Sequence, residues 1–248
     1  MADALLQARS LTVRFGGLTA VDEVSASFNA GELVGIIGPN GAGKTTFFNA
    51  ISGVIAPTAG ALLVDGRDLA GQGPHRYAAH GIARTFQTPR VFADMTAAAN
   101  IDFGLQFAGR LRTAPALLPD ADAILELIGL SRQAFYPAAE ITPSQQRLLE
   151  IGMALATRPR ILLLDEVAAG LTEAEVEAMA QLIRRLRDEM GLAVVWIEHA
   201  VTTLLRHVER VIVLHQGRKI ADGTPAEVVR NAEVVEAYLG DEMNEEPA

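Results

Sequence analysis

The 248-residue sequence contains no cysteine, which excludes disulfide bonds and thiol chemistry and fits a cytoplasmic protein. It also lacks an apolar run of the roughly 18–20 residues that a membrane-spanning helix needs, although half of its residues are hydrophobic. The first residues show no basic segment followed by an apolar one, so no signal peptide is expected. Any role at a membrane must therefore come through a partner protein.

Basic residues are in the minority. The chain has 21 lysines and arginines against 30 aspartates and glutamates, which gives a formal charge of −9 and a pI near 5.1. A protein that binds nucleic acid regardless of sequence needs a basic face. We therefore expect no nucleic-acid partner.

Strand-like and helical segments alternate at both ends of the chain, whereas the middle is helical. The strand-like segments are residues 11–15, 24–28, 33–37, 62–64, 161–165, 193–198 and 211–214. Residues 94–156 are helical in pattern, with Thr96 and Asp120 as candidate N-caps, and Gln216-Gly217-Arg218 is a turn signal. The alternation predicts an α/β protein with a mostly parallel sheet and an inserted helical segment.

A phosphate-binding pattern, G-x-x-x-x-G-K-[ST], begins where an apolar strand meets a helix. Glycines let the backbone N–H groups approach phosphate oxygens, and the helix N-terminus favours the same anion. Lys44 is expected to reach the β- and γ-phosphates of ATP, and the Thr45 hydroxyl to bind Mg²⁺. The alternative is a glycine-rich turn with a chance Lys-Thr. The expected nucleotide contacts from this loop are Gly38, Asn40, Gly41, Ala42, Gly43, Lys44, Thr45 and Thr46.

Two carboxylates end the apolar run at residues 161–166. Side chains alternate along a strand, so the two carboxylates are expected to have different roles. Asp165 suits a contact to Mg²⁺ or its water, and Glu166 suits the polarisation of an attacking water. The alternative is an ordinary solvated strand end.

Together these motifs resemble the ABC transporter ATPase family over nearly the whole chain. The resemblance implies a P-loop NTPase fold: a RecA-like, mostly parallel core with an N-terminal antiparallel β subdomain and an inserted α-helical subdomain. It implies that Gln87 senses the γ-phosphate and the metal, that His199 holds the γ-phosphate, and that Phe15 stacks on adenine. Residues 141–145 stand where the family has its signature, so Thr142, Ser144 and Gln145 are expected to contact the nucleotide of a second subunit.

The resemblance also implies an organisation and a set of partners. Residues 1–240 would form one ABC domain, with the core at 1–87 and 157–240, the helical subdomain at 88–156, and an acidic, frayed tail at 241–248. The partners would be transmembrane permease subunits, a second ABC ATPase subunit that is identical or different, and, indirectly, a periplasmic or extracellular substrate-binding protein. The chain would lie on the cytoplasmic face of the plasma membrane and hydrolyse ATP with Mg²⁺.

Within the family, the sequence is similar to the branched-chain amino-acid uptake group at residues 15–18, 81–92, 226–229 and 237–240. It departs from the family pattern in three places. Pro143 and Ser144 replace both signature glycines, Val167 replaces a proline after Glu166, and Thr172 replaces an acidic or amide residue. These changes affect the expected contact with the partner's ATP rather than the chain's own nucleotide site.

Two other functions remain open from the sequence. A soluble ABC-type ATPase of DNA repair, translation or cluster assembly would usually need a coiled-coil insertion, a second cassette or a basic surface. A kinase-type phosphoryl-transfer enzyme would need a lobe for its acceptor. The sequence shows none of these features, and co-purification with hydrophobic membrane subunits would separate transport from both alternatives.

Overall fold

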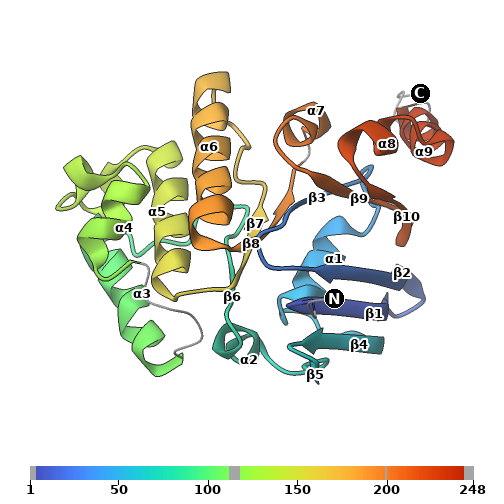
Figure 1. Cartoon of the computed structure of the whole chain (residues 1–248), viewed down its shortest axis with the longest axis horizontal. Helices are drawn as coiled ribbons and strands as arrows, with labels where there is room; N and C mark the ends of the chain where they lie inside the picture. Colours follow the sequence, from blue (N-terminus) through green and yellow to red (C-terminus); the bar gives the residue numbers. More distant parts are fainter. Residues whose placement is uncertain (1–3, 112–117, 199, 243–248) are drawn as a thin grey trace.

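Two β-sheets organise the computed structural model, which describes residues 4–111, 118–198 and 200–242 (Figure 1). The four-stranded antiparallel sheet has the order β2 (Leu18–Phe28), β1 (Leu6–Phe15), β4 (Ala59–Val64), β5 (Arg67–Asp68). The six-stranded sheet has the order β10 (Arg218–Gly223), β9 (Arg210–His215), β3 (Leu33–Ile37), β8 (Ala193–Ile197), β7 (Ile161–Asp165), β6 (Ile82–Arg84). In the second sheet only β10 runs antiparallel to its neighbour.

The central strands of the six-stranded sheet are apolar because both of their faces are covered. Every residue of β3, β7 and β8 is buried. Val34 and Ile36 pack towards the antiparallel sheet and helix α1 (Lys44–Ile51), whereas Leu33 and Ile37 pack towards the helices on the other face. Burial on both faces is typical of parallel strands and explains why these segments were predicted as strands.

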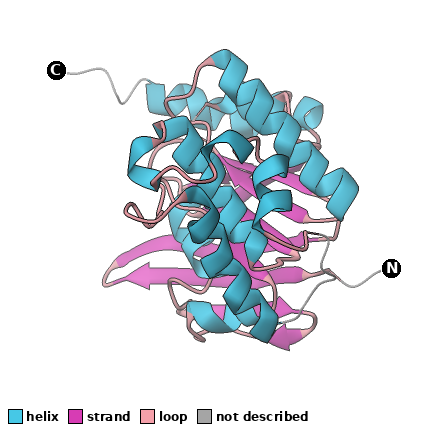
Figure 2. Cartoon of the chain, turned by 90° about the vertical axis from the view of Figure 1, so that its left-hand side faces the viewer, coloured by secondary structure: helices cyan, strands magenta, loops and turns pink. Residues whose placement is uncertain are grey.

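A helical segment is inserted between β6 and β7, at the left of Figure 1. It contains α3 (Ala97–Leu111), α4 (Ala121–Leu127), the short 3₁₀ turns Ser131–Gln133 and Ala138–Glu140, and α5 (Pro143–Ala156). Asp120 accepts a hydrogen bond from the N–H of Ala123 at 2.9 Å, and the Thr96 hydroxyl accepts one from the N–H of Ala99 at 3.1 Å. Both predicted caps are confirmed. Seen from this side, the helices lie in front of the strands (Figure 2).

The remaining helices are α2 (Pro74–Ala79), α6 (Glu173–Met190), α7 (Val201–Leu205), α8 (Pro225–Val229) and α9 (Ala232–Glu242). The turn between β9 and β10 has positive φ at Gln216 (47°) and Gly217 (79°), which suits a two-residue hairpin and confirms the predicted turn. Residues 241 and 242 of the predicted acidic tail belong to α9, and residues 243–248 lie outside the described part.

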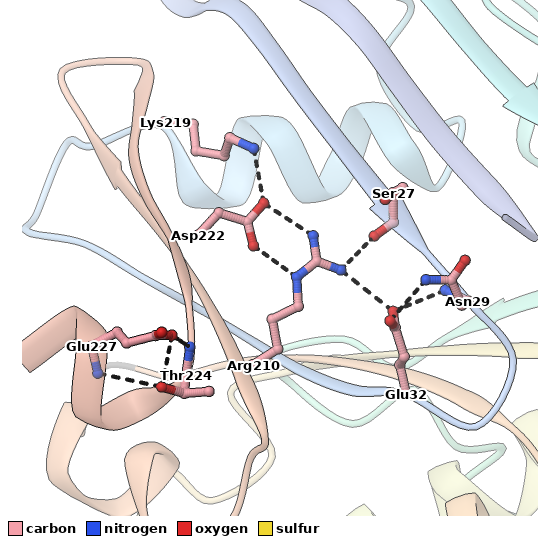
Figure 3. Close-up of polar contacts among 8 residues, drawn as sticks. All are labelled: Ser27, Asn29, Glu32, Arg210, Lys219, Asp222, Thr224 and Glu227. Carbon is pink, nitrogen blue, oxygen red and sulfur yellow. Dashed lines mark hydrogen bonds and ion pairs between the residues drawn. The ribbon is translucent and has the colours of Figure 1, made fainter. Parts of the chain in front are cut away.

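Arg210 connects the two sheets at the start of β9 (Figure 3). Its guanidinium binds both carboxylate oxygens of Asp222 on β10, at 2.7 and 3.0 Å, and donates to the carbonyl of Ser27 on β2 at 2.9 Å. Glu32, just before β3, lies 3.4 Å from the same group, and Lys219 also binds Asp222. One side chain thus holds four segments of the chain together.

Within the described ranges, no helix is both long enough and apolar enough to cross a bilayer.

Candidate nucleotide site

The glycine-rich loop between β3 and α1 has a backbone that only glycine tolerates at two positions. Gly43 has φ of 94°, and a Cβ there would lie 2.3 Å from the carbonyl oxygen of Ala20. A Cβ on Gly38 would lie 2.1 Å from the carbonyl oxygen of Leu214. A β-carbon at either position would push the loop away from its neighbours.

A hollow of about 540 Å³ opens over this loop. Phe15, with half of its surface exposed, lines the hollow together with residues 40–46. The structure thus brings the predicted adenine-stacking ring and all the predicted phosphate contacts of the loop except Gly38 to one surface. Sequence reasoning missed the other lining residues, which are Leu18, Thr19, Ala20, Gln216 and Gly217. Only the turn signal at Gln216-Gly217 pointed to any of them.

The Lys44 ammonium is held against the loop. Its Nζ donates to the carbonyl oxygens of Gly38 at 2.6 Å and Pro39 at 2.9 Å, and the residue is buried. Burial lowers the pKa of Lys44, and the negative charge of Glu166 opposes that shift. This electrostatic effect places the lysine and the strand-end carboxylate in one neighbourhood.

Gln87 and Glu166 are in direct contact although 79 residues separate them. The amide Nε2 of Gln87 donates to Oε2 of Glu166 at 2.7 Å, which leaves the amide oxygen of Gln87 as an acceptor. Glu166 is buried and has φ of 50°, an uncommon conformation for a residue other than glycine. Its N–H donates to the carbonyl of Ile197 on β8 at 3.0 Å, which helps to hold this backbone. The arrangement presents an acidic group close enough to Lys44 for its charge to act on the lysine.

Asp165 has a different partner from Glu166. Its carboxylate forms an ion pair with Arg84 on β6 at 3.1 Å. The same guanidinium donates to Asn49 at 2.8 Å and to Ser52 at 2.9 Å, which ties β7 to α1. Sequence reasoning missed Arg84, and the one signal was a basic residue inside a short apolar segment.

The three residues predicted to bind Mg²⁺, Thr45, Gln87 and Asp165, all supply oxygen atoms, which Mg²⁺ prefers. Among the described residues there is no group of three or more His, Cys, Asp or Glu side chains that would hold a metal. The donor set fits Mg²⁺ bound by few protein groups and by the phosphates of a nucleotide. When bound there, Mg²⁺ would neutralise charge on the β- and γ-phosphates.

The segment that departs from the family signature begins helix α5. The Thr142 hydroxyl accepts from the N–H of Gln145 at 3.2 Å, and Oε1 of Gln145 accepts from the N–H of Thr142 at 3.0 Å. This reciprocal pair is a capping box, and Pro143 occupies the first helical position, where its missing N–H costs little. The substitutions therefore preserve a regular helix start.

Thr172 and Glu198 order the chain beyond Glu166. Thr172 caps α6 through a capping box with Glu175. The buried Glu198 accepts from the N–H of Ala168 at 2.7 Å and from Nε1 of Trp196 at 2.9 Å, and burial raises its pKa. The predicted γ-phosphate contact His199 follows Glu198 directly but lies outside the described residues.

Comparisons with known proteins agree along almost the whole chain. A family model described as ABC transporter matches residues 21–169, and one described as branched-chain amino acid ATP-binding cassette transporter matches residues 218–243.

The high-affinity branched-chain amino acid transport ATP-binding protein BraF of Pseudomonas aeruginosa is 39% identical, covering 97% of this chain and 100% of BraF. The high-affinity branched-chain amino acid transport ATP-binding protein LivG of Escherichia coli K12 is 38% identical, covering 97% of this chain and 100% of LivG. A crystal structure of a nucleotide-free ATP-binding cassette from an ABC transporter is 30% identical, with a TM-score of 0.83 over 95% of this chain and 98% of that one.

Proposed function

Because the chain belongs to the ABC transporter family of ATP-binding cassettes, we propose that it drives the import of branched-chain amino acids or closely related small substrates. As a member of this family it binds nucleotide and hydrolyses ATP. The observation that carries the ATPase part of the proposal is the contact of Gln87 with Glu166, whose charge acts on the nearby Lys44.

Each residue would have a defined part in hydrolysis. Lys44 would bind the β- and γ-phosphates, and Phe15 would stack on the adenine. Glu166 would accept the proton of the attacking water, with His199 holding the γ-phosphate.

Gln87 would keep the carboxylate of Glu166 in place through its amide hydrogen and offer its amide oxygen to the metal or its water. Thr45 and Asp165 would complete the Mg²⁺ contacts.

A second ATPase subunit would complete the site. None of residues 141–145 lines the hollow over the phosphate loop. The N–H of Ser144, in the first turn of α5, has no acceptor among the described residues, as expected of a helix N-terminus. This N–H and the Thr142 hydroxyl are therefore suited to the γ-phosphate of a nucleotide held by another subunit.

The helical segment would dock the permease subunits. Three exposed aromatic rings lie together on it, with Phe103 4.8 Å from Phe92 and 5.0 Å from Phe107 between ring centroids. A groove of about 550 Å³ lies between α2, β6 and α5, and one of the residues that line it is Phe86, next to Gln87. Adjacent exposed aromatic rings are typical of protein interaction surfaces.

The substrate class is supported by the C-terminal part of the chain. The branched-chain family model matches the region of β10, α8 and α9, which lies apart from the nucleotide-binding motifs. BraF and LivG match over their whole length and carry branched-chain amino acid transport in their names.

The test is uptake of labelled leucine, isoleucine and valine by cells lacking the chain. Re-expression of the natural sequence should restore uptake, whereas Lys44→Ala and Glu166→Gln should leave it at background. The purified Glu166→Gln variant should keep its affinity for an ATP analogue and lose hydrolysis by about 100-fold, because an amide is a poor general base.

The exposed Glu126 on α4 provides a matched control, since Glu126→Gln changes the same group far from the phosphate loop. ATP hydrolysis by Glu166→Gln at the rate of the natural chain would refute the role of Glu166. Normal uptake in the deleted cells would refute the substrate, and absence of membrane subunits from purified complexes would favour a soluble ATPase.

A further inference from the structure

Helix α5 carries two charged side chains, Arg147 and Glu150, that both contact the segment around Gln87. Residues three apart in a helix lie on one face, so the two side chains point to the same neighbour. Neither was predicted as a site residue, and neither lines the hollow over the phosphate loop.

Glu150 holds the backbone on both sides of Gln87. One carboxylate oxygen accepts from the N–H of Phe86 at 3.3 Å, and the other accepts from the N–H of Arg90 at 2.9 Å. The residue is only 5% exposed. A buried carboxylate is costly unless its oxygens are hydrogen-bonded, so these two bonds fix the segment to α5.

Arg147 holds the same segment at Gln87 itself. Its Nη1 lies 3.4 Å from the carbonyl oxygen of Gln87 and 2.9 Å from the carbonyl oxygen of Glu166. The side chains of Gln87 and Glu166 also bind each other at 2.7 Å. One guanidinium therefore contacts the backbone of both members of that pair.

Two arginines stiffen the segment. The guanidinium of Arg90 lies 3.9 Å from the centre of the Phe86 ring, and that of Arg84 lies 4.5 Å from it. Arg84 is anchored to Asp165 at the end of β7. The segment is therefore held on one side by the sheet and on the other by α5.

The N-terminus of α5 is the altered signature, less than two helical turns before Glu150. We propose that Arg147 and Glu150 clamp the Gln87 segment to α5, so that Gln87 and residues 142–145 move as one body. The clamp rests on the proposed function, because it joins the contact to this chain's nucleotide with the contact to the partner's nucleotide. Arg147 and Glu150 are positioning residues, since they touch the loop and not the reacting atoms.

Coupling of this kind is reciprocal. If a nucleotide on Lys44 displaces Gln87, the clamp carries the helical segment with it. If a partner's nucleotide engages the start of α5, the Glu150 contacts displace Gln87 relative to Glu166, and the bond of Arg147 to the carbonyl of Glu166 breaks. Loss of the clamp should therefore separate nucleotide binding from movement of the helical segment.

The absence of cysteine allows two engineered cysteines to be spin-labelled without background. Arg132→Cys on the helical segment and Arg67→Cys on β5 are both exposed. The distance distribution between the labels is measured with and without Mg²⁺ and a non-hydrolysable ATP analogue, and analogue affinity is measured in parallel.

The variants are Glu150→Ala, the milder Glu150→Gln, and Gln146→Ala as matched control. Gln146 lies on the same helix but donates to the carbonyl of Ala138 within the helical segment, at 2.8 Å.

In the natural background the analogue should shift the distance distribution. Glu150→Ala should keep analogue affinity within about twofold and lose the shift, Glu150→Gln should show a partial shift, and Gln146→Ala should behave as the natural chain. A full shift in both Glu150 variants overturns the clamp, as does binding without any shift in the natural chain. Failure of the natural chain to bind the analogue refutes the proposed function instead. In that case the clamp is judged without nucleotide, where it requires a broader distribution in Glu150→Ala than in Gln146→Ala.

Discussion

At the residue scale, burial and hydrogen bonding act against each other on Glu150. Burial raises the pKa of this carboxyl group to about 7, although the N–H groups of Arg90 and Phe86 and the charge of Arg147 favour the ionised form. The charge of Arg84 also faces it from β6. The folded chain therefore holds a proton here at a pH at which the unfolded chain has released it.

This raised pKa predicts a pH-dependent stability difference between the natural chain and Glu150→Gln. Between pH of about 4.5 and 7 the folded state binds more protons than the unfolded state, so the free energy of unfolding of the natural chain falls as pH rises. Glutamine does not titrate. The free energy of unfolding of Glu150→Gln, relative to that of the natural chain, should therefore rise by up to about 3 kcal/mol between pH 4.5 and 8.

Urea unfolding at several pH values measures this difference. Glu126→Gln, which makes the same change at an exposed glutamate on α4, is the control for the substitution itself. A difference for Glu150→Gln that stays constant across the range would show that the carboxyl group titrates normally in the folded chain.

The residues that the sequence revealed and those that it hid differ in how far their partners lie along the chain. Lys44 belongs to a contiguous motif, and Glu166 directly follows a strand that the sequence pattern predicts. Arg84 and Glu150 act through partners 81 and 60 residues away. No local sequence pattern predicts such a pair, because the contact between the two residues depends on the tertiary packing of separate segments.

At the element scale, the altered signature is a matter of helix-start chemistry. Thr142, Pro143 and Gln145 build a capping box with proline at the first position. Helix α8 begins in the same way, with Thr224, Pro225 and Glu227. The signature therefore keeps its helix geometry. What changes is the β-carbon of Ser144 and the missing N–H of Pro143, at the surface that we propose faces the partner's phosphate.

We predict that Pro143→Gly combined with Ser144→Gly speeds ATP hydrolysis in the assembled transporter by a few fold. Glycine permits closer backbone approach to the phosphate, although it should weaken the helix start by about 1 kcal/mol. Pro225→Gly with Ala226→Gly makes a comparable change at α8 and should leave the rate unchanged. Steady-state ATPase assays decide, and a rate that is flat or lower in the signature variant would show that these residues do not slow the motor.

Elements were predictable where one strong pattern covered the whole segment. The predicted bounds of β3 and β7 were correct, because these strands are short, apolar and buried on both faces. Strands β1 and β2 are longer than predicted, since polar residues and the positive φ values of Ser10 and Glu23 interrupt their alternation. Strand β6 was missed because it is only three residues long and its stability comes from pairing with β7.

At the scale of the whole molecule, the antiparallel sheet, the parallel sheet and the C-terminal hairpin must be held in one arrangement. The alternation of strand-like and helical segments predicted an α/β chain, but nothing in that pattern revealed which side chains join the layers. The contacts of Arg210 do so (Figure 3). Burial alone would raise the pKa of Asp222, but the hydrogen bonds from Arg210 and Lys219 outweigh it and the pKa is lowered. The ionised carboxylate is thus stabilised by the fold.

Arg210→Met should therefore destabilise the chain by about 2 kcal/mol at pH 7, because it leaves the partly buried Asp222 without its bidentate partner. Asp222 contributes stability above the pKa of an unfolded aspartate, near 4, and this contribution is lost as pH falls through the lower folded value. The difference between the natural chain and Arg210→Met should shrink accordingly in acid.

Arg218→Met is the matched control, since Arg218 pairs with Asp22 but its side chain is 73% exposed, and such pairs contribute at most about 1 kcal/mol. Urea unfolding of both variants at pH 7 and in acid tests the assignment. If Arg210→Met were no more destabilising than Arg218→Met, the layers would be held by their apolar contacts, and the Arg210 network would be a consequence of the arrangement and not its cause.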